Sequence, residues 1–242
     1  MAGTLALTRA ELIRLMRNKR YFIFTVMLPV VLYLIIGRSV KATVYGVSFG
    51  AFYMVDMAML GAFSGALNGN AIRISQEKKD GWIRQLRLTS LPAYAYVVSK
   101  VLVSMVITVT SIVIVFLLGR FFGNVHLSAW QWLVTGIVVW FSATIFAALA
   151  VAIGYRIAPD QVQPVTMIMY LGFAILGGIW YPFSGVLGKV SEFTPTFQGV
   201  KIGADIIEGT SVAAGYAIGL VVWLAIFVAL ATLAVRSTGE TV

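Results

Sequence analysis

The sequence contains no cysteine, and only 11% of its 242 residues are charged. The first absence excludes disulfides, thiolate metal sites and a cysteine nucleophile. The second excludes an ordinary soluble domain, in which about a quarter of the residues carry charge. The single histidine, His126, has no carboxylate at ligand spacing, so we expect neither a metal site nor a metal cofactor in this chain.

Apolar residues dominate what is present: they make up 60% of the chain, and the mean hydropathy is +0.93. A single soluble core of this size cannot bury that much apolar surface. The apolar residues form long continuous runs, whereas the strands of a membrane β-barrel alternate in short segments. The sequence therefore predicts an all-α integral membrane protein.

Six runs are long enough for a helix to cross the hydrocarbon core, which takes about 20 apolar residues. We place these spans near residues 21–37, 46–67, 99–119, 130–153, 163–180 and 213–235. Together they predict a single transmembrane domain over residues 1–242.

The basic residues indicate which way the spans are oriented. If both termini are cytoplasmic, 13 Lys and Arg residues lie inside and five lie outside, the five being Arg38, Lys41, Arg120, Lys189 and Lys201. Basic residues accumulate in cytoplasmic loops of membrane proteins, so we expect cytoplasmic termini. The same rule accounts for the net charge of +9 without nucleic-acid binding.

Residues 5–19 precede the first span and have helical spacing. Leu12 and Leu15 share one side of this segment, and Glu11 and Arg14 share the other. A short basic amphipathic helix suits the membrane interface, so we expect an interfacial helix. A plain basic leader that only sets orientation is the alternative.

A charged, polar segment, residues 73–92, interrupts the apolar sequence between the second and third spans. On a helical period Trp82, Ile83 and Leu86 share one face, and Glu77, Asp80, Arg84 and Arg87 lie opposite. We expect one short cytoplasmic helix that starts near Ser75 and ends before Pro92. Its apolar face favours docking of another protein over the alternative of a solvated loop.

Residues 181–208 follow the fifth span and are too polar to cross the membrane. They hold Pro182 and Pro195 and two weak helical stretches. Irregular backbone at membrane depth persists only where protein or water covers it. We expect an outer re-entrant helical hairpin, with a long outer loop as the alternative.

These features together resemble the permease subunit of a type-2 ABC exporter, in particular small drug-resistance permeases. One motif of the resemblance is Glu77-x3-Gly81-x4-Leu86-Arg87-x-Thr89-Ser90-x-Pro92, followed by Tyr96 and Lys100. The other is Gly177-Gly178-x3-Pro182-x12-Pro195, before the last span. The resemblance covers the whole chain.

The resemblance implies a non-catalytic permease in a bacterial plasma membrane. Its partners would be two copies of a separate ABC ATPase, which carries ATP and Mg, and a second identical or related permease. It implies export of a hydrophobic or amphipathic compound, such as a drug, lipid or natural product. The alternative within the family is a polysaccharide or teichoic-acid exporter. Segment 73–92 would be the coupling helix, and the expected ATPase-coupling residues are Glu77, Asp80, Trp82, Ile83, Arg84 and Arg87.

Asp56 is the one acidic residue inside a predicted span. An ionisable group in a membrane span is costly, which makes Asp56 a candidate for the translocation path. The alternative is a polar contact within the bundle, for example to Ser48 or Asn68. A lipid-modifying enzyme using Asp56 and His126 is a rival function, but catalytic groups must converge at one depth and these two lie at different depths.

Overall fold

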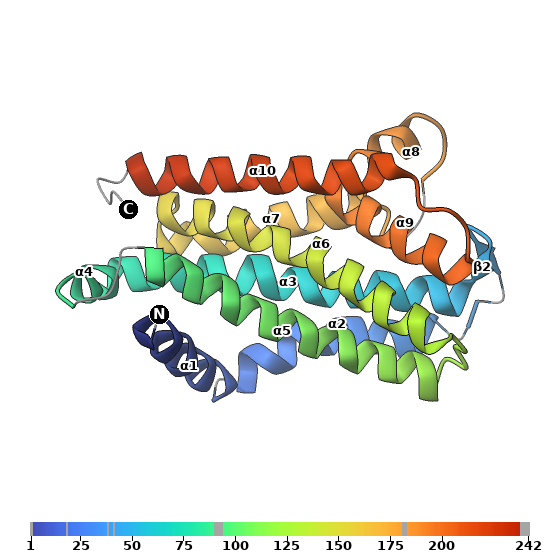
Figure 1. Cartoon of the computed structure of the whole chain (residues 1–242), viewed down its shortest axis with the longest axis horizontal. Helices are drawn as coiled ribbons and strands as arrows, with labels where there is room; N and C mark the ends of the chain where they lie inside the picture. The colour runs from blue at the N-terminus through green and yellow to red at the C-terminus, as the bar shows by residue number, and fades with distance from the viewer. Residues whose placement is uncertain are drawn as a thin grey trace.

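Long helices running roughly along one axis make up the computed structural model of the protein (Figure 1). The structure describes residues 2–17, 19–37, 39–40, 42–89, 94–180 and 183–237. In chain order the elements are α1 (Ala2–Met16), α2 (Lys19–Ile36), β1 (Thr43–Val44), β2 (Val47–Ser48), α3 (Phe49–Lys79), α4 (Trp82–Arg87), α5 (Tyr94–Phe121), α6 (Ala129–Arg156), α7 (Pro159–Leu176), α8 (Gly185–Glu192), α9 (Pro195–Glu208) and α10 (Ala214–Ser237).

The bundle has two distinct ends. We call one the α4 end, because α1, α4 and both chain termini lie there, and the other the hairpin end, which holds β1, β2, α8 and α9 (Figure 1). The six long helices α2, α3, α5, α6, α7 and α10 run alternately from one end to the other (Figure 1). The alternation brings the two termini to the same end, as the prediction of six spans requires.

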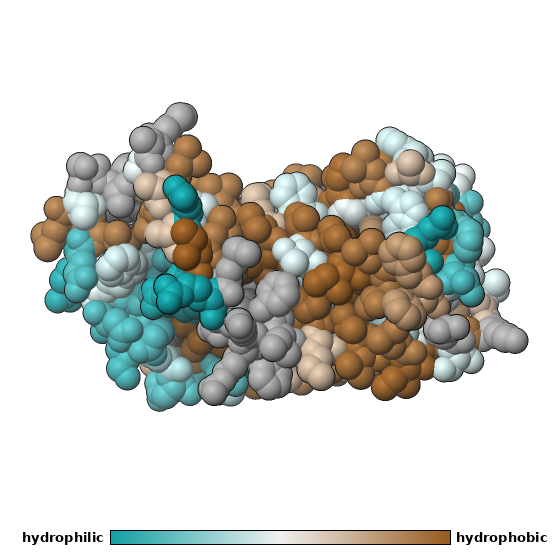
Figure 2. Space-filling model, turned by 90° about the horizontal axis from the view of Figure 1, so that it is seen from below, coloured by the Kyte–Doolittle hydropathy of each residue, from teal (hydrophilic) through white to brown (hydrophobic). Residues whose placement is uncertain are grey.

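Within the residues that the structure describes, four helices are long and apolar enough to cross a membrane: α3, α5, α6 and α10. The chain is thus a membrane protein of the all-α class, as the sequence predicts, with one short β-hairpin. The helices α2 and α7 have 18 residues each and are therefore about 27 Å long. That α2 and α7 also cross the membrane, which would make six spans in total, remains a prediction. Figure 2 shows an apolar band across the middle of the molecule between hydrophilic ends.

Helix α3 is the centre of the bundle and packs against α2, α5, α6, α7 and α9. It has 31 residues, or about 46 Å, so it exceeds a hydrocarbon core of about 30 Å and projects beyond it. The predicted second span began at residue 46, which is wrong, because Val47 and Ser48 form strand β2. The hairpin turns at Tyr45 and Gly46, both at positive φ, and Ser48 then caps α3 by accepting a hydrogen bond from Ala51 N at 3.4 Å.

The prediction of a single helix over 73–92 is also wrong in its bounds. Residues 73–79 are the last turns of α3, and the six-residue α4 follows after Gly81, whose φ of 75° ends the first helix. Ser75 lies inside α3 and caps nothing; it donates a hydrogen bond to the Ile157 carbonyl at 2.7 Å. Residues 90–92 of the predicted segment lie outside the described residues.

Helix α1 corresponds to the predicted interfacial helix but is shifted towards the N-terminus and ends at Met16. Leu15 packs on Val103 and Ile107 of α5, as expected for its apolar side. Glu11, which the helical spacing places opposite Leu12 and Leu15, is also buried inside the chain. A buried carboxylate needs compensating partners, and these partners define the site described below.

Two helices, α8 and α9, occupy the predicted outer hairpin, with Tyr181 and Pro182 outside the described residues. Thr194 caps α9 by accepting from Phe197 N at 3.3 Å, and Pro195 starts the helix. At the other end of α9, the Gln131 amide of α6 donates to the Ile207 carbonyl at 2.9 Å. Helix α9 is buried against α6 and α10, while the depth of the pair in the membrane remains a prediction.

Candidate functional site

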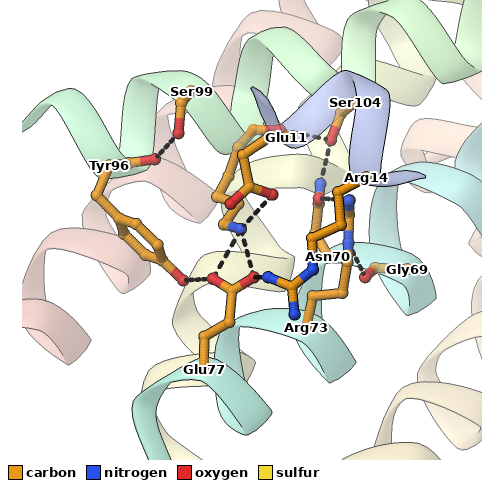
Figure 3. Close-up of polar contacts among 10 residues, drawn as sticks. Glu11, Arg14, Gly69, Asn70, Arg73, Glu77, Tyr96, Ser99 and Ser104 are labelled. Carbon is orange, nitrogen blue, oxygen red and sulfur yellow. Dashed lines mark hydrogen bonds and ion pairs between the residues drawn. The ribbon is translucent and has the colours of Figure 1, made fainter. Parts of the chain in front are cut away.

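A buried lysine holds three helices together at the α4 end. The Lys100 side chain, on α5, is only 1% exposed. Its Nζ lies 2.8 Å from Oε2 of Glu11 on α1, and 2.7 and 2.8 Å from the two carboxylate oxygens of Glu77 on α3. Figure 3 shows both carboxylates converging between the helices. We call Glu11, Arg14, Glu77, Tyr96 and Lys100 the ion cluster.

Two further side chains complete the coordination of Glu77. The Tyr96 hydroxyl donates to Oε2 of Glu77 at 2.7 Å, and Nη1 of Arg14 lies 3.5 Å from Oε1 (Figure 3). The Arg14 side chain is 68% exposed, so it forms the solvent-exposed rim of an otherwise buried cluster. Two acids and two bases balance each other, which is the condition for charges to remain inside a protein.

A second group of polar side chains extends the ion cluster along the α3–α5 contact. Asn70 donates to the Ser104 hydroxyl and accepts from Arg73 at 2.7 Å, and Ser104 donates to the Lys100 carbonyl at 3.1 Å (Figure 3). Residues 70, 73 and 77 lie three and four apart on α3, and residues 96, 100 and 104 lie four apart on α5. This spacing aligns each set on one helix face, so the two polar faces meet.

Helix α4 is fixed beside this cluster by apolar packing. Ile83 is 6% exposed and packs with Ile74, Tyr96, Tyr155 and Val235, which belong to α3, α5, α6 and α10. Trp82 and Leu86 are partly buried against the same group. The apolar cluster around α4 thus includes residues of four long helices, among them the tyrosine that binds Glu77.

The end of α3 is also joined to α6. Nζ of Lys78 donates to the Tyr155 carbonyl at 2.6 Å, near the C-terminus of α6, where a positive charge is favourable. The hydrogen bond from Ser75 to the Ile157 carbonyl, at 2.7 Å, lies one turn away. The last turns of α3 are thus fixed to α1, α5 and α6 by polar bonds.

The structure separates the expected coupling residues into two groups. Glu77 and Ile83 are buried within the chain and Trp82 is turned towards the same core, so these side chains face the bundle, and their part in coupling stays a prediction. Asp80 and Arg84 are exposed and remain available to a partner. The side chain of Arg87 lies outside the described part of the chain.

Asp56 lies in the buried middle of the bundle and is 1% exposed. The alternative contacts to Ser48 and Asn68 are wrong, because Ser48 caps α3 and Asn68 donates to Ser64 at 3.4 Å. Within the described residues neither carboxylate oxygen has a hydrogen-bond partner. Its place on a translocation path stays a prediction. His126, by contrast, is exposed, with Nδ1 2.8 Å from the Asn124 carbonyl oxygen.

Sequence reasoning missed the ion cluster although its signals were present. Tyr96 and Lys100 belong to the motif that carried the resemblance, but no role was assigned to them. Glu11 is the only acid before the first span, and Lys100 opens an apolar run. Opposite charges facing apolar surroundings on separate helices are the signal that could have suggested their pairing.

Comparison with known proteins identifies a family and a relative. The family described as ABC-2 family transporter protein matches residues 38–235 of the chain. A similar protein is the "Putative transport permease YvfS" of Bacillus subtilis (strain 168), which is 26% identical over 206 residues, and the match covers 84% of each chain.

Proposed function

The chain belongs to the ABC-2 transporter family, and from this premise we propose that it is the permease of an ATP-driven exporter that receives its motion at the α4 end. Membership makes it the membrane subunit of an ABC transporter, which works with an ABC ATPase subunit. The export direction, the cargo and the route of coupling are the proposed parts.

The ATPase that family membership implies would be a partner subunit. Residues 1–242 contain no G-x-x-x-x-G-K-[ST] string, so they do not form the loop that cradles nucleotide phosphates. ATP and Mg would bind to the partner. We propose two ATPase copies and two permease copies, because the permeases that this chain resembles work in pairs.

The distribution of basic residues supports a cytoplasmic α4 end. With that orientation 13 of the 18 Lys and Arg residues lie on the inner side. Both termini would be cytoplasmic and the hairpin end extracellular, in a plasma membrane. The exposed residues Asp80, Arg84 and Leu88 would then face the ATPase.

The ion cluster carries the proposal for coupling. Lys100 binds carboxylates from α1 and α3 while it sits on α5, so these three helices move as one body when α4 is pushed. Closure of the ATPase would displace α4 and rotate this body against the rest of the bundle. Rigid-body rotation of packed helices is a common form of such transitions.

We propose that the cargo is a hydrophobic or amphipathic compound. The resemblance to small drug-resistance permeases supports this class. Vesicles containing the permease and its co-purified ATPase provide the test, with an amphipathic fluorescent dye as the probe. ATP-dependent movement of the dye would support the proposal; movement of a polysaccharide probe instead would overturn it.

A substitution at Leu88 tests the docking surface. Leu88 follows α4 and is 87% exposed, so Leu88→Asp should leave the helices intact and weaken ATPase retention roughly tenfold, the scale of one lost interface contact. The measurement is the amount of ATPase that co-purifies with the permease. Val186→Asp is the matched control, because Val186 is 80% exposed at the hairpin end. Equal retention by both variants would contradict the docking surface.

A further inference from the structure

An apolar groove lies between α5 and α6 near the hairpin end. It has a volume of about 310 Å³ and is lined by Val109, Val113 and Phe116 of α5 and by Trp132, Gly136 and Trp140 of α6. The two helices run side by side and are joined by a loop at the hairpin end (Figure 1). The groove opens on the outer surface of the bundle, where Val113 is 48% exposed and the neighbouring Ile137 is 51% exposed.

Specific contacts close the two ends of the groove. At one end the rings of Phe116 and Trp132 pack with centroids 5.2 Å apart. At the other, the Trp140 indole donates to the Met105 carbonyl at 3.0 Å and ties α6 to α5. Between them Gly136 has no side chain, which leaves the floor open. On α5 the lining from Val109 to Phe116 extends about 10 Å, the scale of part of an acyl chain.

A cationic side chain stands at the end of the groove that lies nearer the hairpin end. A second hollow of about 230 Å³ shares Val113, Phe116 and Trp132 with the groove and reaches Arg120. Arg120 is exposed in the last turn of α5, and no ion pair joins it to an acid in the described part of the chain. Arginine at a helix end places its charge at the level of the lipid headgroups, where tryptophan is also enriched.

We propose that this groove binds a phospholipid with an anionic headgroup. One acyl chain would lie between Val109, Gly136 and Trp132, and the phosphate would contact Arg120. The other lipids around the protein contact a convex apolar surface. The proposed bound lipid would contact a groove that is bounded at both ends and has a positive charge at one of them. The positive charge of Arg120 attracts the negative charge of an anionic headgroup held at the end of the groove. This lipid site requires only that α5 and α6 cross the membrane, and it does not depend on the ATPase or on the cargo.

Native mass spectrometry of the purified full-length chain tests this site. The probes are phosphatidylglycerol and phosphatidylcholine with the same acyl chains, added at equal concentration. We expect the unchanged protein to retain phosphatidylglycerol more tightly. Gly136→Leu should fill the groove and lower retention of both lipids. Arg120→Gln should lower the preference for phosphatidylglycerol over phosphatidylcholine by about fivefold, the scale of one basic side chain at a lipid surface.

Two control variants keep the test specific. In Gly136→Ala the added Cβ would lie 3.5 Å from the Phe116 ring, an ordinary contact, so lipid retention should be unchanged. Lys189→Gln removes an exposed charge at the same end of the bundle and should preserve the preference. Unchanged retention in Gly136→Leu, or an unchanged preference in Arg120→Gln, would overturn the proposal. The proposal would also be overturned if the two groove variants changed only the ratio of monomer to dimer and not lipid retention, since a second copy of the chain would then cover the groove.

Discussion

Replacing Lys100 by methionine is expected to lower the free energy of unfolding by about 3–5 kcal/mol, the cost of leaving buried charges without their partner. Among the described residues, Lys100 is the one cation that touches both Glu11 and Glu77, and its side chain is 1% exposed. Without it two carboxylates face each other inside the protein, and Arg14 reaches only Glu77 from the exposed rim. Thermal unfolding of the detergent-solubilised protein measures the loss.

The control for this prediction is Lys189→Met, which removes an exposed lysine from α8. It should change stability by less than about 0.5 kcal/mol, as surface substitutions usually do. If Lys100→Met were no more destabilising than Lys189→Met, the ion cluster would not hold the three helices together.

The triple variant Lys100→Met, Glu11→Gln, Glu77→Gln separates stability from coupling. Replacing a complete buried ion group by neutral residues is often close to neutral for stability, so most of the loss should be recovered. The hydrogen bond from Tyr96 can persist, because the glutamine side chain introduced on α3 still offers a carbonyl oxygen as acceptor. If the charges transmit the motion of α4, ATP-dependent transport should stay low although the fold is restored. Full transport by the triple variant would refute this role of the cluster.

A second large effect is expected at the crossing of α3 and α6. Gly154 of α6 lies so close to α3 that an added Cβ would stand 2.7 Å from Cβ of Ile74 and 2.9 Å from the Ala71 carbonyl oxygen. Backbone atoms cannot move aside cheaply, so Gly154→Ala should destabilise the protein by about 1–3 kcal/mol. It should also disturb the neighbouring bonds from Lys78 and Ser75 to the end of α6.

Gly136→Ala on the same helix is the matched control. Its added Cβ meets only the Phe116 ring, at 3.5 Å, so no clash arises. Alanine is favoured over glycine inside a helix by about 1 kcal/mol, and this variant should be neutral or slightly more stable. In thermal unfolding, Gly154→Ala should therefore unfold at a lower temperature than the unchanged protein, and Gly136→Ala at the same or a slightly higher temperature. A stabilising Gly154→Ala would mean that α3 and α6 cross less closely.

Both predictions concern the α4 end, where the ion cluster and the close crossing of α3 and α6 lie near each other. Lys100 joins α1, α3 and α5, and Gly154 brings α6 against the same stretch of α3. Ile83 of α4 packs on residues of α3, α5, α6 and α10. This end of the bundle therefore has the rigidity that transmission of a push from an ATPase would need.

The sequence by itself determined the class of the protein and most of its helices. Long runs without charge can satisfy their backbone in a membrane only as helices, so the runs predict where the long helices lie. Local residues also set the start of α9, because Thr194 and Pro195 are a cap and a first helical residue that need no distant partner. The motif through Lys100 suggested the family before any contact was known.

Only the tertiary structure decided which faces meet. The sequence indicates that the apolar face of Trp82, Ile83 and Leu86 is covered. It does not say by what, because an apolar face that packs on the same chain and one that packs on a partner have the same sequence pattern. The pairing of Glu11 and Glu77 with Lys100 joins three helices that are far apart along the chain. Helical periodicity fixes the side of a helix on which a residue lies, whereas the packing of whole helices decides what stands opposite it.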